Sequence, residues 1–269
     1  MTGNTGIKIS GSGDNTGTSY LDGVTILNKH LENIGRPGMV TGRCQNVVVQ
    51  YNLSLDNAGG FVEILGNNSN CCYRYNISIN DGFRVKGENG TQQEGKVLWT
   101  SGYVERGNKK HSPYNSYIYN NTIFVKEDIR SCFSFTLTTD GIFIANNIFY
   151  ILGETENVSG DQDTQVEDQT QTIDNVVFTN NLYENVNILP ESLSIKDSNP
   201  FIGDPIFNNP GGVEPVDYKP TNNAVIKDKG IKIEKLPGDA IGLTIGFDVE
   251  TDYFGNPIKG LPDIGAIEI

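Results

Sequence analysis

Hydrophobic and polar residues alternate over short segments in the first two thirds of the chain, and most of these segments end on asparagine. The six clearest segments are VTILNK (24–29), VVVQYN (47–52), CYRYN (72–76), YIYNN (117–121), FIANN (143–147) and VFTNN (177–181). An alternation of period two over such short runs is typical of β-strands and not of helices. The pattern predicts an all-β chain of short strands joined by polar turns.

The polar residues that end these segments recur at a spacing that indicates a structural repeat. The intervals are 23, 24, 45, 26 and 34 residues, counted from Lys29 through Asn52, Asn76, Asn121 and Asn147 to Asn181. A repeat of about 20–25 residues made of short strands buries a core only by stacking on its neighbours. In residues 46–66, VVVQY, LSL and FVEIL read as three strands joined by turns of Asn, Asp and Gly. We therefore expect three short strands per coil, paired in parallel, with the asparagines stacked into a ladder.

These residues resemble the right-handed parallel β-helix of the pectate-lyase-like superfamily, which carries an asparagine ladder at one sharp turn. The resemblance covers about residues 6–185 and implies a right-handed single-chain solenoid. The tail resembles the closing segment of many secreted bacterial β-helix proteins, in SNPFIGDPIFNNPGG (198–212), DYKPTNNAVIKDKGI (217–231) and DYFGNPIKGLPDIGAIE (252–268). We expect coils over 1–190, with insertions at 88–115 and 153–173, and a C-terminal capping segment over 191–269.

The two insertions differ in chemistry. Residues 88–115 contain the only tryptophan, Trp99, together with Tyr103 and His111. Long loops on a rigid scaffold often bind ligands, and aromatic rings pack on the faces of sugars. The alternative is an arm that only covers the flank of the solenoid. Residues 153–173 are acidic and read as a solvated loop; Ca²⁺ is the cofactor that their carboxylates suit, but the spacing matches no defined calcium loop, so no metal ligands are assigned.

Alternation also defines an outward face on the strand that follows each Gly-containing turn. In FVEIL it directs Glu63 outward, and in FRVKG it directs Arg84 and Lys86 outward. Aligning Val62 with Phe83 places Glu63 beneath Arg84. The whole column is then expected to contain Lys8, Thr41 or Arg43, Glu63, Arg84 with Lys86, and Ser134 with Thr136.

This column suits β-elimination from a uronic-acid polymer. Cations neutralise the uronate carboxylate so that the adjacent C–H becomes acidic, and a Lys or Arg of lowered pKa removes the proton. Glycoside hydrolysis needs two carboxylates flanking the bond, and Glu63 is the only clear carboxylate on the column. We expect catalytic roles for Lys86, Arg84 and Glu63, and substrate contacts from Arg43, Trp99, Tyr103 and His111.

The segment FVEILGNN…FRVKGEN is also similar in layout to the alginate- and chondroitin-lyase branch of this fold. That resemblance implies a Ca²⁺-ligand position at Glu63 and puts Lys86 at the position of the catalytic arginine. The sequence departs from the family at the partner lysine, where it has Leu65 or Gly66. The alternative is an ion pair between Glu63 and Arg84 on a solvated face.

Composition narrows the class of partner. A formal charge of −13 argues against nucleic acid, which needs a basic surface. The four cysteines show no CxxC spacing and only two histidines exist, which disfavours a zinc site and leaves one disulfide open. No stretch approaches the ~20 apolar residues of a membrane span. The chain enters the strand pattern at once without a signal peptide, so we expect a fragment that begins within the solenoid.

These observations together predict a secreted, cell-surface or periplasmic carbohydrate-active protein that acts as a monomer on an acidic polysaccharide. A polysaccharide lyase is favoured over a glycoside hydrolase. The alternative is a non-catalytic solenoid that binds glycan or serves as a structural element, including as a fragment of a larger enzyme.

Overall fold

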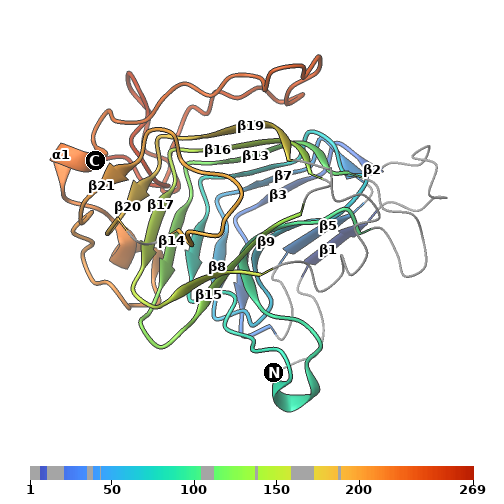
Figure 1. Cartoon of the computed structure of the whole chain (residues 1–269). Helices are drawn as coiled ribbons and strands as arrows, with labels where there is room; N and C mark the ends of the chain where they lie inside the picture. The colour runs from blue at the N-terminus through green and yellow to red at the C-terminus, as the bar shows by residue number, and fades with distance from the viewer. Residues whose placement is uncertain are drawn as a thin grey trace.

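The structure is a computed structural model, and it describes residues 7–10, 21–34, 39–42, 44–103, 112–136, 139–158, 173–186 and 189–269. Over these residues the chain forms a right-handed parallel β-helix, against which a long C-terminal segment packs (Figure 1). Among the described residues, helical structure is limited to η1 (Glu88–Gly90), η2 (Pro215–Tyr218) and α1 (Asn223–Ile226). No helix within the described ranges combines the length and hydropathy that a membrane span requires.

Three parallel sheets run along the solenoid. The first sheet consists of β1 (Ile7–Ser10), β5 (Met39–Gly42), β9 (Gly60–Ile64), β12 (Lys96–Thr100), β15 (Ser131–Phe135) and β18 (Thr155–Asn157). The second consists of β3 (Thr25–Leu27), β7 (Val48–Gln50), β10 (Cys72–Arg74), β13 (Tyr114–Tyr119), β16 (Asp140–Ala145) and β19 (Asp174–Thr179). The third consists of β4 (His30–Glu32), β8 (Leu53–Leu55), β11 (Ile77–Ile79), β14 (Thr122–Val125), β17 (Ile148–Ile151), β20 (Leu182–Tyr183) and β21 (Phe201–Ile202). The short strands β2 (Leu21–Asp22) and β6 (Cys44–Gln45) pair beside the second sheet. The three sheets confirm the predicted coil of three strands.

The hydrophobic core lies inside the coil. It includes side chains from all three sheets, such as Val62 of the first, Val49 of the second and Ile123 of the third. Phe149 and Tyr183, on neighbouring coils, stack with ring centroids 5.5 Å apart and an interplanar angle of 10°. Stacking of like residues follows from parallel pairing in register, so each coil buries its apolar face on the next.

The predicted asparagine ladder is present, and it runs in one direction. The Nδ2 group of each ladder residue donates to Oδ1 of the next, at 3.0 Å from Asn52 to Asn76 and at 2.9, 2.9 and 2.8 Å through Asn121 and Asn147 to Asn181. Each Oδ1 also accepts the backbone N–H of the preceding ladder residue, as in Asn76 N to Asn121 Oδ1 at 3.1 Å. The backbone and side-chain polar groups of this buried turn thereby have hydrogen-bond partners.

The ladder ends on Asp197. Its carboxylate accepts from the backbone N and the Nδ2 group of Asn181, at 3.2 and 2.8 Å, and from the Tyr183 hydroxyl at 3.0 Å. An ionised carboxylate accepts and does not donate, so it terminates a series in which every member must donate forward. Leu193 and Ile195, on the same segment, enter the core and close this end of the solenoid.

A second column of residues lies directly before the ladder residues and faces the C-terminal segment. Asn120, Asn146 and Asn180 adopt φ of 50°, 56° and 60°, a left-handed conformation that asparagine tolerates better than most residues. Their Nδ2 groups donate to the backbone carbonyls of Asp263, Ile231 and Lys229, at 2.7, 2.8 and 2.8 Å. The paired asparagines in the sequence therefore have separate roles, the first binding the tail and the second forming the ladder.

The C-terminal segment covers the outer sides of the second and third sheets. On the third sheet, Ile77, Phe124 and Ile148 form one buried cluster with Tyr218 and Ile264 of the tail. On the second sheet, Tyr117 and Tyr119 are buried with Leu236 and Leu243. In Figure 1 the orange-to-red trace follows these two sides and lies away from β1, β5, β9 and β15.

The long interval between Asn76 and Asn121 is divided differently from the predicted insertion at 88–115. Residues 96–100 form β12, an ordinary strand of the first sheet, so Trp99 belongs to the scaffold and not to a loop. The additional residues lie on both sides of this strand, in 80–95 and between β12 and β13. Of the acidic stretch 153–173, residues 155–157 form β18, and 159–172 lie outside the described residues.

Replacing a central ladder residue should destabilise the whole solenoid. Asn121 makes contacts to Asn76, Tyr73, Tyr119 and Asn147, all of them buried, so Asn121→Ala leaves several polar groups unpaired. We expect a loss of about 3–5 kcal/mol in the free energy of unfolding. Urea unfolding followed by circular dichroism measures it.

The matched control is Asn223→Ala, an exposed asparagine in α1. We expect this control to change the free energy of unfolding by less than about 1 kcal/mol. Equal losses in the two variants would contradict a structural role for the ladder.

Candidate functional site

The outer side of the first sheet is where sequence patterning places the candidate site. The register of this sheet sets Lys8 beside Val40, Thr41 beside Ile64, Glu63 beside Trp99, and Trp99 beside Ser134. The predicted alignment of Lys8, Glu63 and Ser134 at one level is therefore correct. Thr41 lies one position away, at the level of the core residue Ile64.

The predicted alignment of Val62 with Phe83 is wrong, because Val62 pairs with Leu98. Trp99 thus occupies the level at which Arg84 was expected. The cause is visible in the backbone: Arg84 N donates to Ala58 O at 3.0 Å, and Lys96 N donates to the next carbonyl, Gly59 O, at 3.1 Å. The residues between these two contacts leave the sheet as a loop. Gly95 N donates to Arg84 O at 2.7 Å and so joins the two ends of this loop. We call residues 83–95 the excursion loop.

The two cations predicted to be catalytic lie on the excursion loop. Arg84 is half-buried, and its guanidinium donates to the carbonyls of Gln93 and Glu94 at 2.8 and 3.2 Å. Lys86 is exposed, and its backbone N donates to the Glu94 carboxylate at 2.9 Å. Arg84 therefore fastens the base of the loop, whereas the Lys86 side chain lies on its exposed surface.

Arg130 connects the excursion loop to the last coil. Its guanidinium lies 3.0 Å from the Glu94 carboxylate and 2.5 Å from that of Glu156. Glu156 belongs to β18, so the bridge extends across the starts of β12, β15 and β18. Charge-assisted contacts of this kind fix the loop relative to the sheet, with a modest stabilising effect because Arg130 is partly exposed.

A second buried contact lies on β12 itself. The Lys96 ammonium is 4.2 Å from the centroid of the Trp99 ring and donates to Glu94 O at 3.1 Å. Both side chains are almost fully buried, at 1% and 2% exposure. A desolvated ammonium over the face of an indole ring is a favourable arrangement, and it holds the ring in place. Cys132 lies at the same end of the sheet, and burial raises the pKa of its thiol to about 11, which leaves it protonated and unreactive at neutral pH.

The remaining predicted residues are distributed as follows. Glu63 is buried at 6% exposure, beside Trp99. Tyr103 is half-buried just beyond β12, where its carbonyl accepts from Gly66 N at 2.9 Å. Arg43 and His111 lie outside the described residues. The first sheet therefore brings Glu63 and Trp99 together, while Arg84 and Lys86 lie on the adjoining loop.

Sequence reasoning missed Lys96, Glu94 and Arg130. KVLWT has the length of a strand of this sheet, and the structure pairs it with GFVEI, Lys96 beside Gly60. A similar alternation in FRVKG concealed it. Arg130 and Glu94 carry no local signal, since only the stacking of three coils brings them together.

Metal ligands were not assigned from the sequence. Within the part of the chain that the structure describes, no three or more His, Cys, Asp or Glu side chains are grouped as metal ligands would be. Most of the acidic stretch 153–173, for which Ca²⁺ was considered, lies outside that part.

No protein-family model matches the chain, and no curated protein is significantly similar to it.

One carboxylate near the loop is structural. Asp81 is fully buried at the turn before the excursion loop, where it accepts from Asn57 N at 2.9 Å and from the Ser78 hydroxyl at 2.7 Å. Burial raises its pKa from 3.8 to about 6, although these hydrogen bonds act in the opposite direction.

The raised pKa gives a pH-dependent prediction. The pKa of Asp81 is higher in the folded than in the unfolded chain, so the unfolded chain loses its proton first as pH rises. The free energy of unfolding therefore falls between about pH 4 and pH 6. Asp81→Asn removes that loss and keeps an acceptor for Asn57 N. We expect the variant to be more stable than the parent by up to about 3 kcal/mol at pH 7, and nearly equal to it at pH 4. Urea unfolding at both pH values measures this, and a difference that does not change with pH would contradict it.

Proposed function

We propose that this chain is a carbohydrate-active protein that binds an acidic polysaccharide over the first sheet, beside the excursion loop. The supporting observation is that the tail clusters occupy the outer sides of the second and third sheets, whereas the contact described between the tail and the first sheet is at its last strand, where Asn157 of β18 donates to Ser192 O at 2.9 Å. Every residue of β9, β12 and β15 is buried, so a polymer on this side of the solenoid would meet the excursion loop and not the strands themselves.

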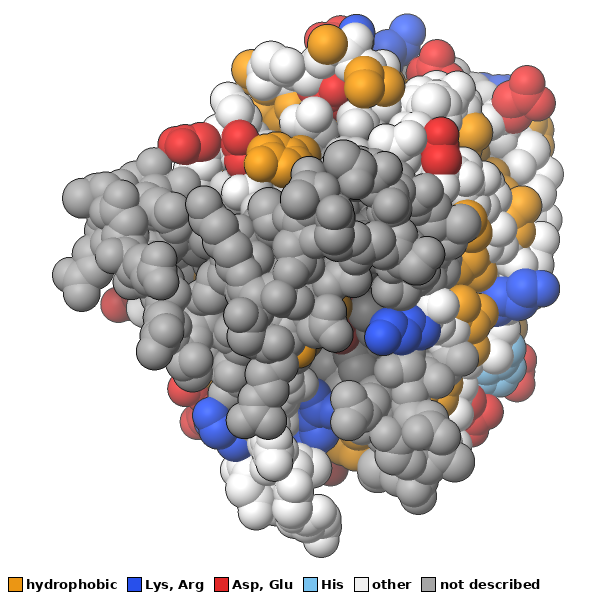
Figure 2. Space-filling view, turned by 90° about the vertical axis from the view of Figure 1, so that its right-hand side faces the viewer, with side chains coloured by type: hydrophobic (Ala, Val, Ile, Leu, Met, Phe, Trp, Pro, Cys, Tyr) orange, Lys and Arg blue, Asp and Glu red, His pale blue; other side chains and the backbone are white. Residues whose placement is uncertain are grey.

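Two cations of the excursion loop suit an acidic ligand, and the same loop also carries Glu88 and Glu94. Figure 2 shows basic and acidic side chains interspersed on the face it presents, without an extended patch of either sign among the described residues. Attraction of a polyanion therefore depends on individual cations. Lys86 is exposed and Arg84 is half-buried on the excursion loop, which adjoins the sheet, so both lie where a polymer on this sheet would pass.

Binding is the part of this proposal that the geometry supports best. Trp99, Lys96 and Ser134 are buried to 2% exposure or less, so they position the loop and the sheet and do not meet a polymer directly. The groups left to meet it are cations, which neutralise a uronate carboxylate. Cleavage by β-elimination would add a proton-abstracting base, and we treat it as a separate readout.

The same proposal places the chain with secreted β-helix proteins of the pectate-lyase type. The support is the combination of a directional asparagine ladder, coils of three strands and a closing segment packed against the side. Because this fold carries many functions, the polysaccharide has to be identified by experiment.

Removing the loop charges should weaken binding. We expect the double variant Arg84→Gln, Lys86→Gln to bind polygalacturonate, alginate or chondroitin sulfate roughly tenfold more weakly at low salt, through loss of about 1–1.5 kcal/mol of Coulomb attraction. Affinity electrophoresis against each polymer measures the effect, and absorbance of a new C=C bond in the same samples reports elimination.

The matched control is Lys227→Gln, Lys229→Gln, which removes two exposed lysines with the same spacing on the tail. It should retain parental affinity. The proposal is wrong if no acidic polymer is retained by the parent chain, or if both double variants weaken binding equally.

A further inference from the structure

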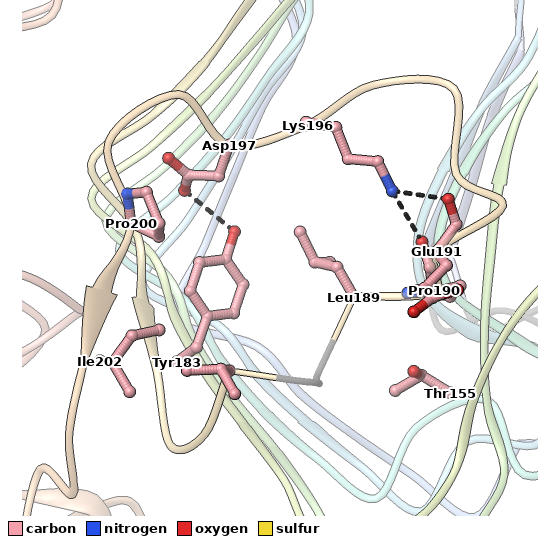
Figure 3. Close-up of a pocket in the computed structure, with 10 residues that line it drawn as sticks. Thr155, Tyr183, Leu189, Pro190, Glu191, Lys196, Asp197, Pro200 and Ile202 are labelled. Carbon is pink, nitrogen blue, oxygen red and sulfur yellow. Dashed lines mark hydrogen bonds between the residues drawn. The ribbon is translucent and has the colours of Figure 1, made fainter.

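A cavity of about 600 Å³ opens at the C-terminal end of the solenoid. Its size falls within the range of small-ligand sites. The lining comes from β18, β20, β21 and the segment that closes the core, and it consists of Thr155, Tyr183, Val186, Leu189, Pro190, Glu191, Lys196, Asp197, Pro200 and Ile202. Figure 3 shows Tyr183 and Asp197 facing one another on one side, with Lys196 and Glu191 across from them and Leu189 between.

The polar groups of this cavity are held in place before any ligand arrives. Asp197 terminates the asparagine ladder, so its carboxylate is fixed by Asn181, by the Tyr183 hydroxyl and by Asn199 N at 2.9 Å. The Lys196 ammonium donates to the carbonyls of Pro190 and Glu191 at 3.1 and 2.8 Å. Groups that are already positioned lose little entropy when a ligand binds.

Each wall retains hydrogen-bonding capacity. An ammonium carries three donors, and two of those on Lys196 have partners among the described residues. The carboxylate Oδ1 of Asp197 accepts one contact, from Asn199 N, and has room for a second. Thr155 adds a hydroxyl, while Leu189, Pro190, Pro200 and Ile202 supply the apolar surface between these groups.

The charges of the lining select the class of ligand. An anion would meet the carboxylates of Asp197 and Glu191, and a cation would meet the Lys196 ammonium. A wholly apolar ligand would desolvate all three without replacing their hydrogen bonds. A neutral ring with several hydroxyl groups can hydrogen-bond to the ammonium and to the carboxylates, because each hydroxyl both donates and accepts. The C–H faces of such a ring pack on the apolar surface.

We propose that this cavity is a binding site for a neutral sugar residue, formed by the closing segment and by Thr155 at the last strand of the first sheet. Lys196 donates to a sugar hydroxyl, Asp197 and Thr155 accept from others, and the ring lies on Leu189 and the two prolines. The site does not depend on the proposed binding of acidic polymers, since its ligand differs in charge and lies at the end of the solenoid.

Saturation-transfer NMR on the full chain tests the site with glucose, galactose, mannose, N-acetylglucosamine and the disaccharides cellobiose and lactose, each compared with galacturonate. We expect a saturation-transfer signal from at least one neutral sugar, and weaker binding of galacturonate. Lys196→Met keeps the aliphatic stem and removes the donor, and it should weaken binding about tenfold. Thr155→Val, which replaces a hydroxyl by a methyl group, should weaken binding about threefold.

The control is Lys235→Met, because Lys235 is another exposed lysine whose ammonium donates to a backbone carbonyl, that of Ala240. It should bind the sugar as the parent does. The inference is overturned if no neutral sugar gives a saturation-transfer signal, or if galacturonate binds more tightly than every neutral sugar. It is also overturned if neither Lys196→Met nor Thr155→Val weakens binding.

Discussion

The directional hydrogen bond between ladder asparagines is the interaction on which the rest of the structure depends. Each amide donates forward to the next coil and accepts from the coil behind, so a shift of one residue in any coil would break contacts on both sides. The ladder therefore fixes the register of all three sheets. It also requires an acceptor at its end, which Asp197 supplies where the chain turns to close the core.

The residue before each ladder asparagine positions the C-terminal tail on the outer surface of the solenoid. Its left-handed backbone turns the Asn120, Asn146 and Asn180 side chains toward the tail, where they bind backbone carbonyls. In an earlier coil Tyr51 has the same position and conformation, and its hydroxyl donates to Thr251 O at 2.7 Å. A single turn thus orders the core on one side and places the tail on the other, which leaves the first sheet as the side that the tail does not cover.

Particular residues mark where the sequence was sufficient. The ladder asparagines were predictable because their spacing repeats with the coil, and Lys8, Glu63 and Ser134 followed from that register. Phe83 was misplaced because alternation in FRVKG looks the same in a loop as in a strand, and the contacts to Ala58 and Gly59 that decide the matter are long-range. The Arg130 bridge and the end cavity were out of reach for the same reason, since both are formed by segments brought together only in the stacked coils.

The proposed binding face is the first sheet with the excursion loop, because the tail covers the other two sheets. Hydrogen–deuterium exchange of the full chain, with and without the acidic polymer that binds most tightly, tests it directly. The account predicts slower exchange on binding in peptides from 60–64, 83–100 and 130–135, and no change in peptides from 200–269. Protection confined to the tail peptides, with the first sheet unchanged, would contradict it.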